Sequence, residues 1–85
     1  MTVTLTATPD PVNAGGQLHI EYCDPNEPAG EVNISIGNAG APPTIHKIDL
    51  DGDGCGSLDF DVPTGWTAVI VNAPGATQVT VDVTP

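Results

Sequence analysis

The densest group of ionisable residues in the sequence is an aspartate-rich segment near its middle. Asp49, Asp51 and Asp53 occupy alternate positions and are followed by Gly54, which matches the start of a D-x-D-x-D-G calcium loop. In such loops the alternating carboxylates converge on a hard cation, and the glycine permits a sharp turn. The match then fails, because Phe60 stands where the loop requires its bidentate acid.

Two interpretations of this segment stay open. Asp-Gly pairs are typical of tight turns between strands, so a plain hairpin turn accounts for the segment. Alternatively, Asp49, Asp51 and Asp53 bind calcium weakly, with a dissociation constant on the order of 10⁻⁴–10⁻³ M. The sequence indicates no other cofactor.

Cys23 and Cys55 are the two cysteines of the chain. They either form a disulfide, which would indicate an oxidising, extracellular setting, or remain free thiols. Metal binding by the two sulfurs is not favoured, because no further cysteine or well-spaced histidine completes a four-ligand site.

His19 and His46 are the two imidazoles. Neither has a neighbouring serine or cysteine with an orienting acid in the sequence, as nucleophilic catalysis would require. We expect His19 to be solvated and His46 to be partly buried. Asp59 and Asp61 could imitate the acid pair of a glycosidase, but they project from one open strand face. The sequence therefore predicts that the protein is not an enzyme.

Seven strand-like segments must position these residues. Most alternate apolar and polar residues, and turns rich in Gly, Pro, Asn and Asp separate them. Segment 66–73 is apolar at both parities, which predicts a central place in its sheet. The seven segments are residues 3–7, 18–23, 32–36, 45–50, 58–62, 66–73 and 79–83.

Seven short strands, most of them with one apolar face, predict an all-β fold. The layout favours a seven-stranded antiparallel β-sandwich of the immunoglobulin-like type, formed by residues 1–85 as one domain. The alternative is a five-stranded barrel of the oligosaccharide-binding type, which usually has longer strands and often a helix.

The second and fifth strands of such a sandwich are antiparallel neighbours. Pairing Cys23 with Cys55 places Ile20 opposite Leu58, so the apolar faces of the two strands agree. A cross-strand disulfide on the outer face is then geometrically reasonable and would stabilise the fold by roughly 3–4 kcal/mol.

Several short motifs give the chain a resemblance to a known family. They are residues 5–9 (Leu-Thr-Ala-Thr-Pro), 14–18 (Ala-Gly-Gly-Gln-Leu), 23–25 (Cys-Asp-Pro), 51–54 (Asp-Gly-Asp-Gly) and 62–63 (Val-Pro). With them the chain resembles the immunoglobulin-like domains of bacterial surface proteins and of tailed-phage virion proteins. It departs from antibody domains, because its sixth segment lacks a cysteine and begins with Trp66. The motifs mark turns and the ends of strands, so they support a fold more than a function.

The charge of the chain narrows the classes of partner. Eleven acidic residues face a single Lys47, giving a formal net charge of −10. Nucleic acids and anionic membrane surfaces are therefore excluded as partners, whereas cations or a basic protein are favoured. No apolar run approaches the ~20 residues of a membrane-spanning helix, so no membrane insertion is expected. Carbohydrate binding is not favoured either, because Trp66 is the one candidate for an exposed aromatic platform.

We therefore expect a non-enzymatic structural or binding module with a protein partner. The first hypothesis is a phage virion protein, a capsid decoration or surface domain. It rests on the resemblance, on the start at Met1 without signal-peptide features, and on the end just after the last strand. The alternative is a spacer or adhesin module of a larger secreted or cell-surface protein, located extracellularly and continuing beyond Met1 and Pro85.

Overall fold

The computed structural model describes residues 3–26, 29–38 and 40–85. Within them every regular element is a β-strand, so no helix that could cross a bilayer occurs there. Met1, Thr2 and parts of the expected loops 24–30 and 37–43 lie outside the described residues. The strands are β1 (Thr4–Thr8), β2 (Val12–Asn13), β3 (Gln17–Cys23), β4 (Glu31–Gly37), β5 (Thr44–Asp49), β6 (Cys55–Asp61), β7 (Ala68–Asn72) and β8 (Val79–Thr84).

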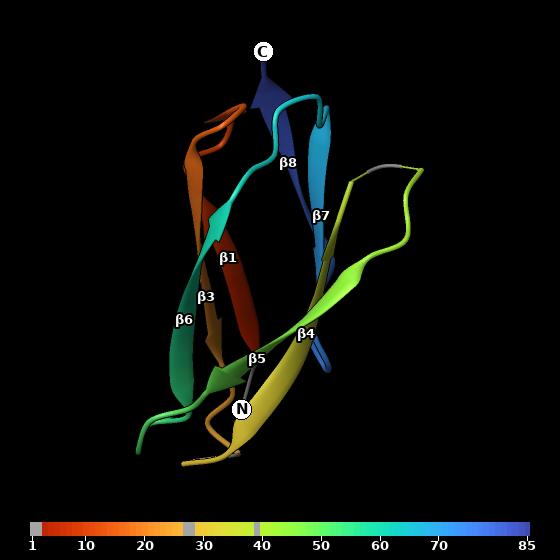
Figure 1. The fold of residues 1–85 in the computed structure, drawn as a ribbon. Helices are drawn as coiled ribbons and strands as arrows, with labels where there is room; N and C mark the ends of the chain where they lie inside the picture. Colours follow the sequence, from red (N-terminus) through yellow and green to blue (C-terminus); the bar gives the residue numbers. More distant parts are fainter. Residues whose placement is uncertain (1–2, 27–28, 39) are drawn as a thin grey trace.

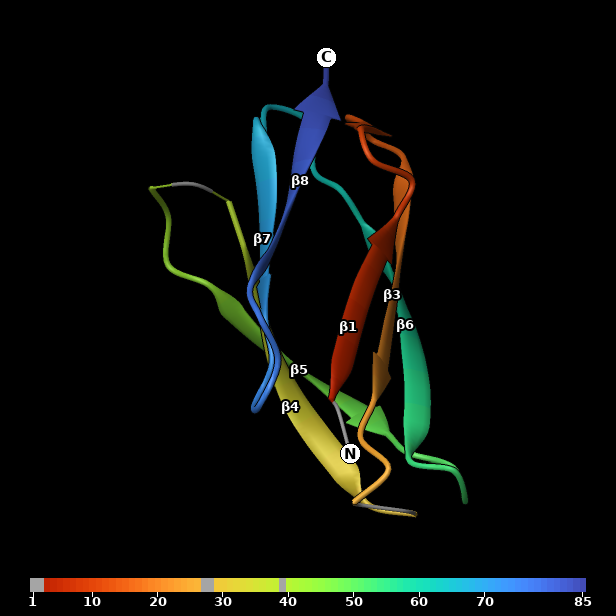
Figure 2. The ribbon, with the colours of Figure 1, turned by 180° about the vertical axis from the view of Figure 1, so that it is seen from behind.

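The strands form two sheets that face each other (Figures 1 and 2). One has three strands in the order β1-β3-β6, and the other has five in the order β2-β8-β7-β4-β5. The all-β prediction is therefore confirmed. The long strands 4–8, 17–23, 31–37, 44–49, 55–61, 68–72 and 79–84 lie close to the seven expected segments, and β6 begins earlier than expected, at Cys55.

An eighth strand corrects the expectation of seven wholly antiparallel strands. After β1 the chain passes Pro9 and Pro11, each preceded by a cis peptide bond, and enters the other sheet. There β2 pairs in parallel with β8, with Val12 beside Val83, which makes this sheet mixed. Proline has no N–H to donate to a β-ladder, so Pro9 and Pro11 favour an end of the first strand at this point.

The core lies between the two sheets. Its side chains come from the inward positions of the strands, as the alternation of apolar and polar residues predicts. β7 lies between β8 and β4, so the predicted central place of this segment is confirmed. The buried hydrophobic residues are Ala7, Val12, Leu18, Ile20, Tyr22, Val32, Ile34, Ile36, Ile48, Leu50, Val62, Val69, Val71 and Val81.

Two contacts fix the three-stranded sheet against the rest of the molecule. The buried Tyr22 of β3 donates its hydroxyl hydrogen to the carbonyl oxygen of Pro74, at 3.0 Å. Gly56 of β6 packs so close to β5 that a Cβ atom there would collide with Ile48 and with the carbonyl of Asp49. Both contacts hold β3 and β6 in place and leave their outer faces open.

Candidate functional site

The outer face of the three-stranded sheet gathers most of the candidate residues. β3 and β6 pair antiparallel, with Ile20 opposite Leu58, which confirms the predicted register. The same register sets His19 opposite Asp59 and Cys23 opposite Cys55. Because side chains alternate along a strand, these four point to the outer face together.

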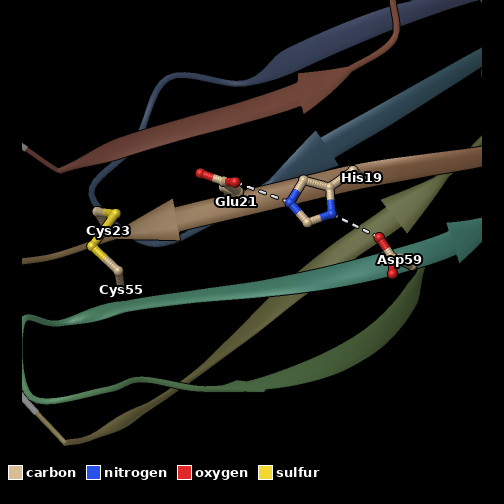
Figure 3. A network of polar contacts seen from close by, with 5 residues as sticks. All are labelled: His19, Glu21, Cys23, Cys55 and Asp59. Carbon is tan, nitrogen blue, oxygen red and sulfur yellow. Dashed lines mark hydrogen bonds and ion pairs between the residues drawn. A yellow bond between two sulfur atoms is a disulfide. The ribbon is translucent and has the colours of Figure 1, made fainter.

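Cys23 and Cys55 are joined by a disulfide at one end of this face (Figure 3). They lie directly opposite each other at the last pair of the β3–β6 ladder, and both are half-buried. The bridge links residues 32 positions apart in the sequence. It therefore fastens β3 to β6 at the end where the Asp-rich turn enters β6.

His19 lies between two carboxylates at the middle of the same face (Figure 3). Its Nδ1 is 2.7 Å from Oδ1 of Asp59 on the neighbouring strand, and its Nε2 is 3.0 Å from Oε1 of Glu21 on its own strand. The His19 side chain is 42% exposed. In the imidazolium form both ring N–H groups donate, one to each carboxylate. His19 is thus exposed on the outer face, as expected, and the two carboxylate contacts are a feature that the sequence did not predict.

These two contacts raise the pKa of His19 above its ordinary value of 6.5. The main cause is the hydrogen bond to Asp59, followed by the one to Glu21, because both favour the charged imidazolium. At neutral pH the His19 ring is therefore protonated to a greater extent than a free imidazole would be. The ring binds a proton and links β3 to β6 through its bond to Asp59. Among the described residues, its hydrogen-bond partners are the two carboxylates, and none is a serine hydroxyl or a cysteine thiol.

The Asp-rich turn is organised around Asp51. Its Oδ1 accepts the backbone N–H of Asp53 at 2.8 Å and that of Cys55 at 3.1 Å. Asp49 is the last residue of β5, and its Oδ1 lies 4.0 Å from Nζ of Lys47. The three candidate calcium ligands thus lie at the end of β5 and in the turn that follows it, and the Asp51 carboxylate already accepts two backbone N–H groups.

A shallow hollow of about 220 Å³ lies beside the disulfide. Glu21, Asp51 and Ser57 line it together with the two cysteines. In the described part of the chain no group of three His, Cys, Asp or Glu side chains is arranged to hold a metal ion. Weak calcium binding by the turn stays a prediction.

His46 and Trp66 lie apart from this face. His46 is half-buried, as expected, and its ring meets the edge of Phe60 with centroids 5.7 Å apart. Trp66 precedes β7 instead of opening it, and its ring packs against Phe60 in a tilted arrangement, at 5.6 Å between centroids. Asp61 lies on the outer face of β6 with Asp59 and accepts a hydrogen bond from the side-chain amide of Gln17.

The His19–Asp59 pair was within reach of the sequence. The register that pairs Ile20 with Leu58 places His19 opposite Asp59 by counting one residue along each strand. Glu21 is two residues from His19, so it shares the same face. The signal for this pair is an acid opposite the histidine on the neighbouring strand, which a comparison of residues along the chain alone does not detect.

Comparison of the chain with family models, with curated proteins and with solved structures finds no match. The function must therefore be argued from the residues and their geometry.

Proposed function

We propose that this chain is an immunoglobulin-like structural or binding module, without catalytic activity, that works in an oxidising environment outside the cytoplasm. The observation that carries the proposal is the Cys23–Cys55 disulfide across β3 and β6. Stable disulfides are typical of secreted proteins and virion or cell surfaces, and small domains depend on them most.

The order of the strands supports the immunoglobulin-like part of the proposal. β1, β3 and β6 follow the A-B-E order of that fold, while β8, β7 and β4 follow its G-F-C order. β5 extends the second sheet beside β4, as the C′ strand does in variable-type domains. The first strand is divided between the two sheets as β1 and β2.

The absence of catalysis is supported by the way the polar groups of the outer face are used. His19 is held by two carboxylates, and Asp51 is held by two backbone N–H groups. These groups satisfy one another on an open face, whereas catalytic groups usually converge on a substrate in a concave pocket. These hydrogen bonds hold the outer face in one conformation, which suits a structural or binding role.

For the assembly, the first candidate is a phage virion, in which the domain decorates the capsid or another surface. This candidate rests on the resemblance of the sequence motifs. The second candidate, a spacer or adhesin module of a larger secreted or cell-surface protein, is favoured by the disulfide. Both require a protein partner and no nucleic acid.

Fractionation of the culture fluid of the source organism by density, followed by intact-mass analysis, tests the assembly. A species of 8.6 kDa in the particle fraction supports the virion protein. These residues found within a longer secreted chain support the module. A reduced, intracellular protein would overturn the proposal.

A further inference from the structure

We propose, resting on the function above, that the free edge of β5 is the docking site and that it takes up an extended segment of a protein partner by strand addition. Ile45 marks this edge. It is 66% exposed and is the one large hydrophobic side chain that is exposed among the described residues. Proteins usually protect a free edge strand with a charge, a proline, a bulge or a covering segment, and an apolar side chain at Ile45 gives this edge none of these.

The backbone of β5 is open for pairing at this position. The N–H of Leu50 donates to the carbonyl of Gly30, so Leu50 faces the β4 side, and β5 alternates from there. The N–H and C=O groups of Thr44, His46 and Ile48 therefore face β4. Those of Ile45 and Lys47 face the free edge, because β5 is the outermost strand of its sheet.

The two ends of β5 differ in what covers them. At the C-terminal end, the carbonyl of Asp49 approaches Gly56 of β6. Lys47 is the residue that could block the edge with its charge, but its Nζ lies 3.3 Å from Oε2 of Glu31 on β4, away from the edge. The open window therefore extends from Thr44 to Lys47.

The surface on the β4 side of Ile45 carries no charge. Ser35 of β4 lies opposite Ile45 on one side and opposite Asn72 of β7 on the other. A hollow of about 200 Å³ lies at the same end of the sheet, lined by Pro43, Ile70 and Asn72 and by small or amide residues of the adjoining loop. In a chain of net charge −10, this neutral strip is a place where a partner can dock with the least desolvation of carboxylates.

Charge complementarity identifies the partner as an extended, basic peptide segment. Glu31 and Asp49 flank Lys47 at one end of the window and leave a net negative charge there. A second copy of this chain would bring another charge of −10 to the interface, which opposes association. A partner strand with alternating apolar residues can place one of them on Ile45. A Lys or Arg at the end of that strand can then pair with Glu31 and Asp49.

The test is titration of the ¹⁵N-labelled 85-residue chain with the synthetic peptide Lys-Thr-Val-Thr-Val-Thr-Lys, followed by NMR. We expect amide shifts to change at Ile45 and Lys47 and not along the other edge strands, β1, β2 and β6. A peptide methylated at alternate backbone nitrogens should not bind, because it cannot pair as a strand.

Two pairs of variants separate backbone pairing from side-chain contact. Lys47→Pro removes a free-edge N–H without removing a bond to β4, and should weaken binding about tenfold, whereas Lys47→Gln should leave the backbone contribution in place. Ile45→Lys should weaken binding, and Thr6→Lys, with the same change of charge on the other sheet, should not. Thermal unfolding of each variant checks that it is folded.

Shifts confined to β1, β2 or β6, no shifts at any edge, or unchanged binding by folded Lys47→Pro would overturn the proposal. Shifts at β5 that depend on protein concentration without peptide would assign the edge to a second copy instead. None of these outcomes changes where the protein resides or whether its cysteines are joined, so the proposed function is tested separately.

Discussion

At the residue scale, His19 is the side chain whose charge depends most on its neighbours. Because the hydrogen bond to Asp59 is the largest cause of its raised pKa, Asp59→Asn should lower the pKa of His19 toward 6.5. Glu21→Gln should lower it by less. NMR titration of the imidazole C–H signals measures the pKa of His19 in the wild type and in both variants. An equal pKa in the wild type and in Asp59→Asn would contradict the hydrogen bond between His19 and Asp59.

The same contact makes stability depend on pH in a definite direction. A pKa that is raised on folding adds stability below the unfolded-state value of 6.5, and this stability is lost as the pH rises through the folded-state value. His19→Gln should therefore reduce the free energy of unfolding more at pH 5 than at pH 9. Urea unfolding at the two pH values measures the difference. A larger loss at pH 9 would contradict it.

Gly56 and Gly52 form a matched pair for testing how closely the sheets pack. Gly56→Ala should lower the free energy of unfolding by about 1–3 kcal/mol, because its Cβ would collide with the carbonyl of Asp49. Gly52→Ala meets no atom within 4 Å, so it should be neutral or stabilise by roughly 0.4–1 kcal/mol. Equal effects in urea unfolding would show that the approach of β6 to β5 is looser than described.

Much of the residue-level arrangement on the outer face follows from sequence. Alternation along β3 and β6 is enough to place Cys23 opposite Cys55, once Ile20 and Leu58 are required to share the core. The role of Asp51 as acceptor for two backbone N–H groups does not follow, because the D-x-D-x-D-G spacing serves both a turn and a calcium loop. Whether the segment is a turn or a calcium loop depends on the direction of each carboxylate, which the spacing does not determine.

At the element scale, the disulfide carries a large share of the stability of a small domain. The double variant Cys23→Ser, Cys55→Ser should lose roughly 3–4 kcal/mol of unfolding free energy, chiefly because the unfolded chain regains the freedom of a closed loop. Guanidinium unfolding of the variant and of oxidised wild type measures this loss. A loss below about 1 kcal/mol would show that the β3–β6 ladder holds without the bridge.

β2 shows where prediction of elements from sequence ends. Residues Val12 and Asn13 form too short a segment for a periodic pattern, and the prolines before them indicate a turn. Only the other sheet supplies the reason for a strand there, since Val12 is buried and Ala14 donates its N–H to the carbonyl of Thr84. The longer strands were predictable because each repeats its apolar face several times.

At the scale of the whole molecule, the net charge of −10 is the dominant feature. Like charges spread over a small domain repel one another, so screening them with salt should stabilise the folded state. Raising NaCl from 10 to 200 mM should increase the melting temperature, by about 4–8 °C if screening contributes on the order of 1 kcal/mol. Calorimetry at the two salt concentrations measures this. A fall in melting temperature would mean that attractive ion pairs, such as those of His19 and Lys47, outweigh the repulsion.

The layered fold could be predicted from seven alternating segments, whereas the function could not. Strand periodicity reports which residues face a core, and it contains no information about which edge meets a partner. The exposure of Ile45 became visible only when β5 was found at the end of its sheet, with Ile45 on the outer face. The identity of the partner depends on the sequence of another molecule, so this sequence does not contain it.

The most direct test of the central claim is alkylation of the native protein, collected from its source under acidic quenching, with and without prior reduction. The claim of a disulfide-linked module outside the cytoplasm predicts that intact mass spectrometry finds no label before reduction and two labels, on Cys23 and Cys55, after it. Two labels on the unreduced native protein would contradict the claim and place the domain in a reducing compartment.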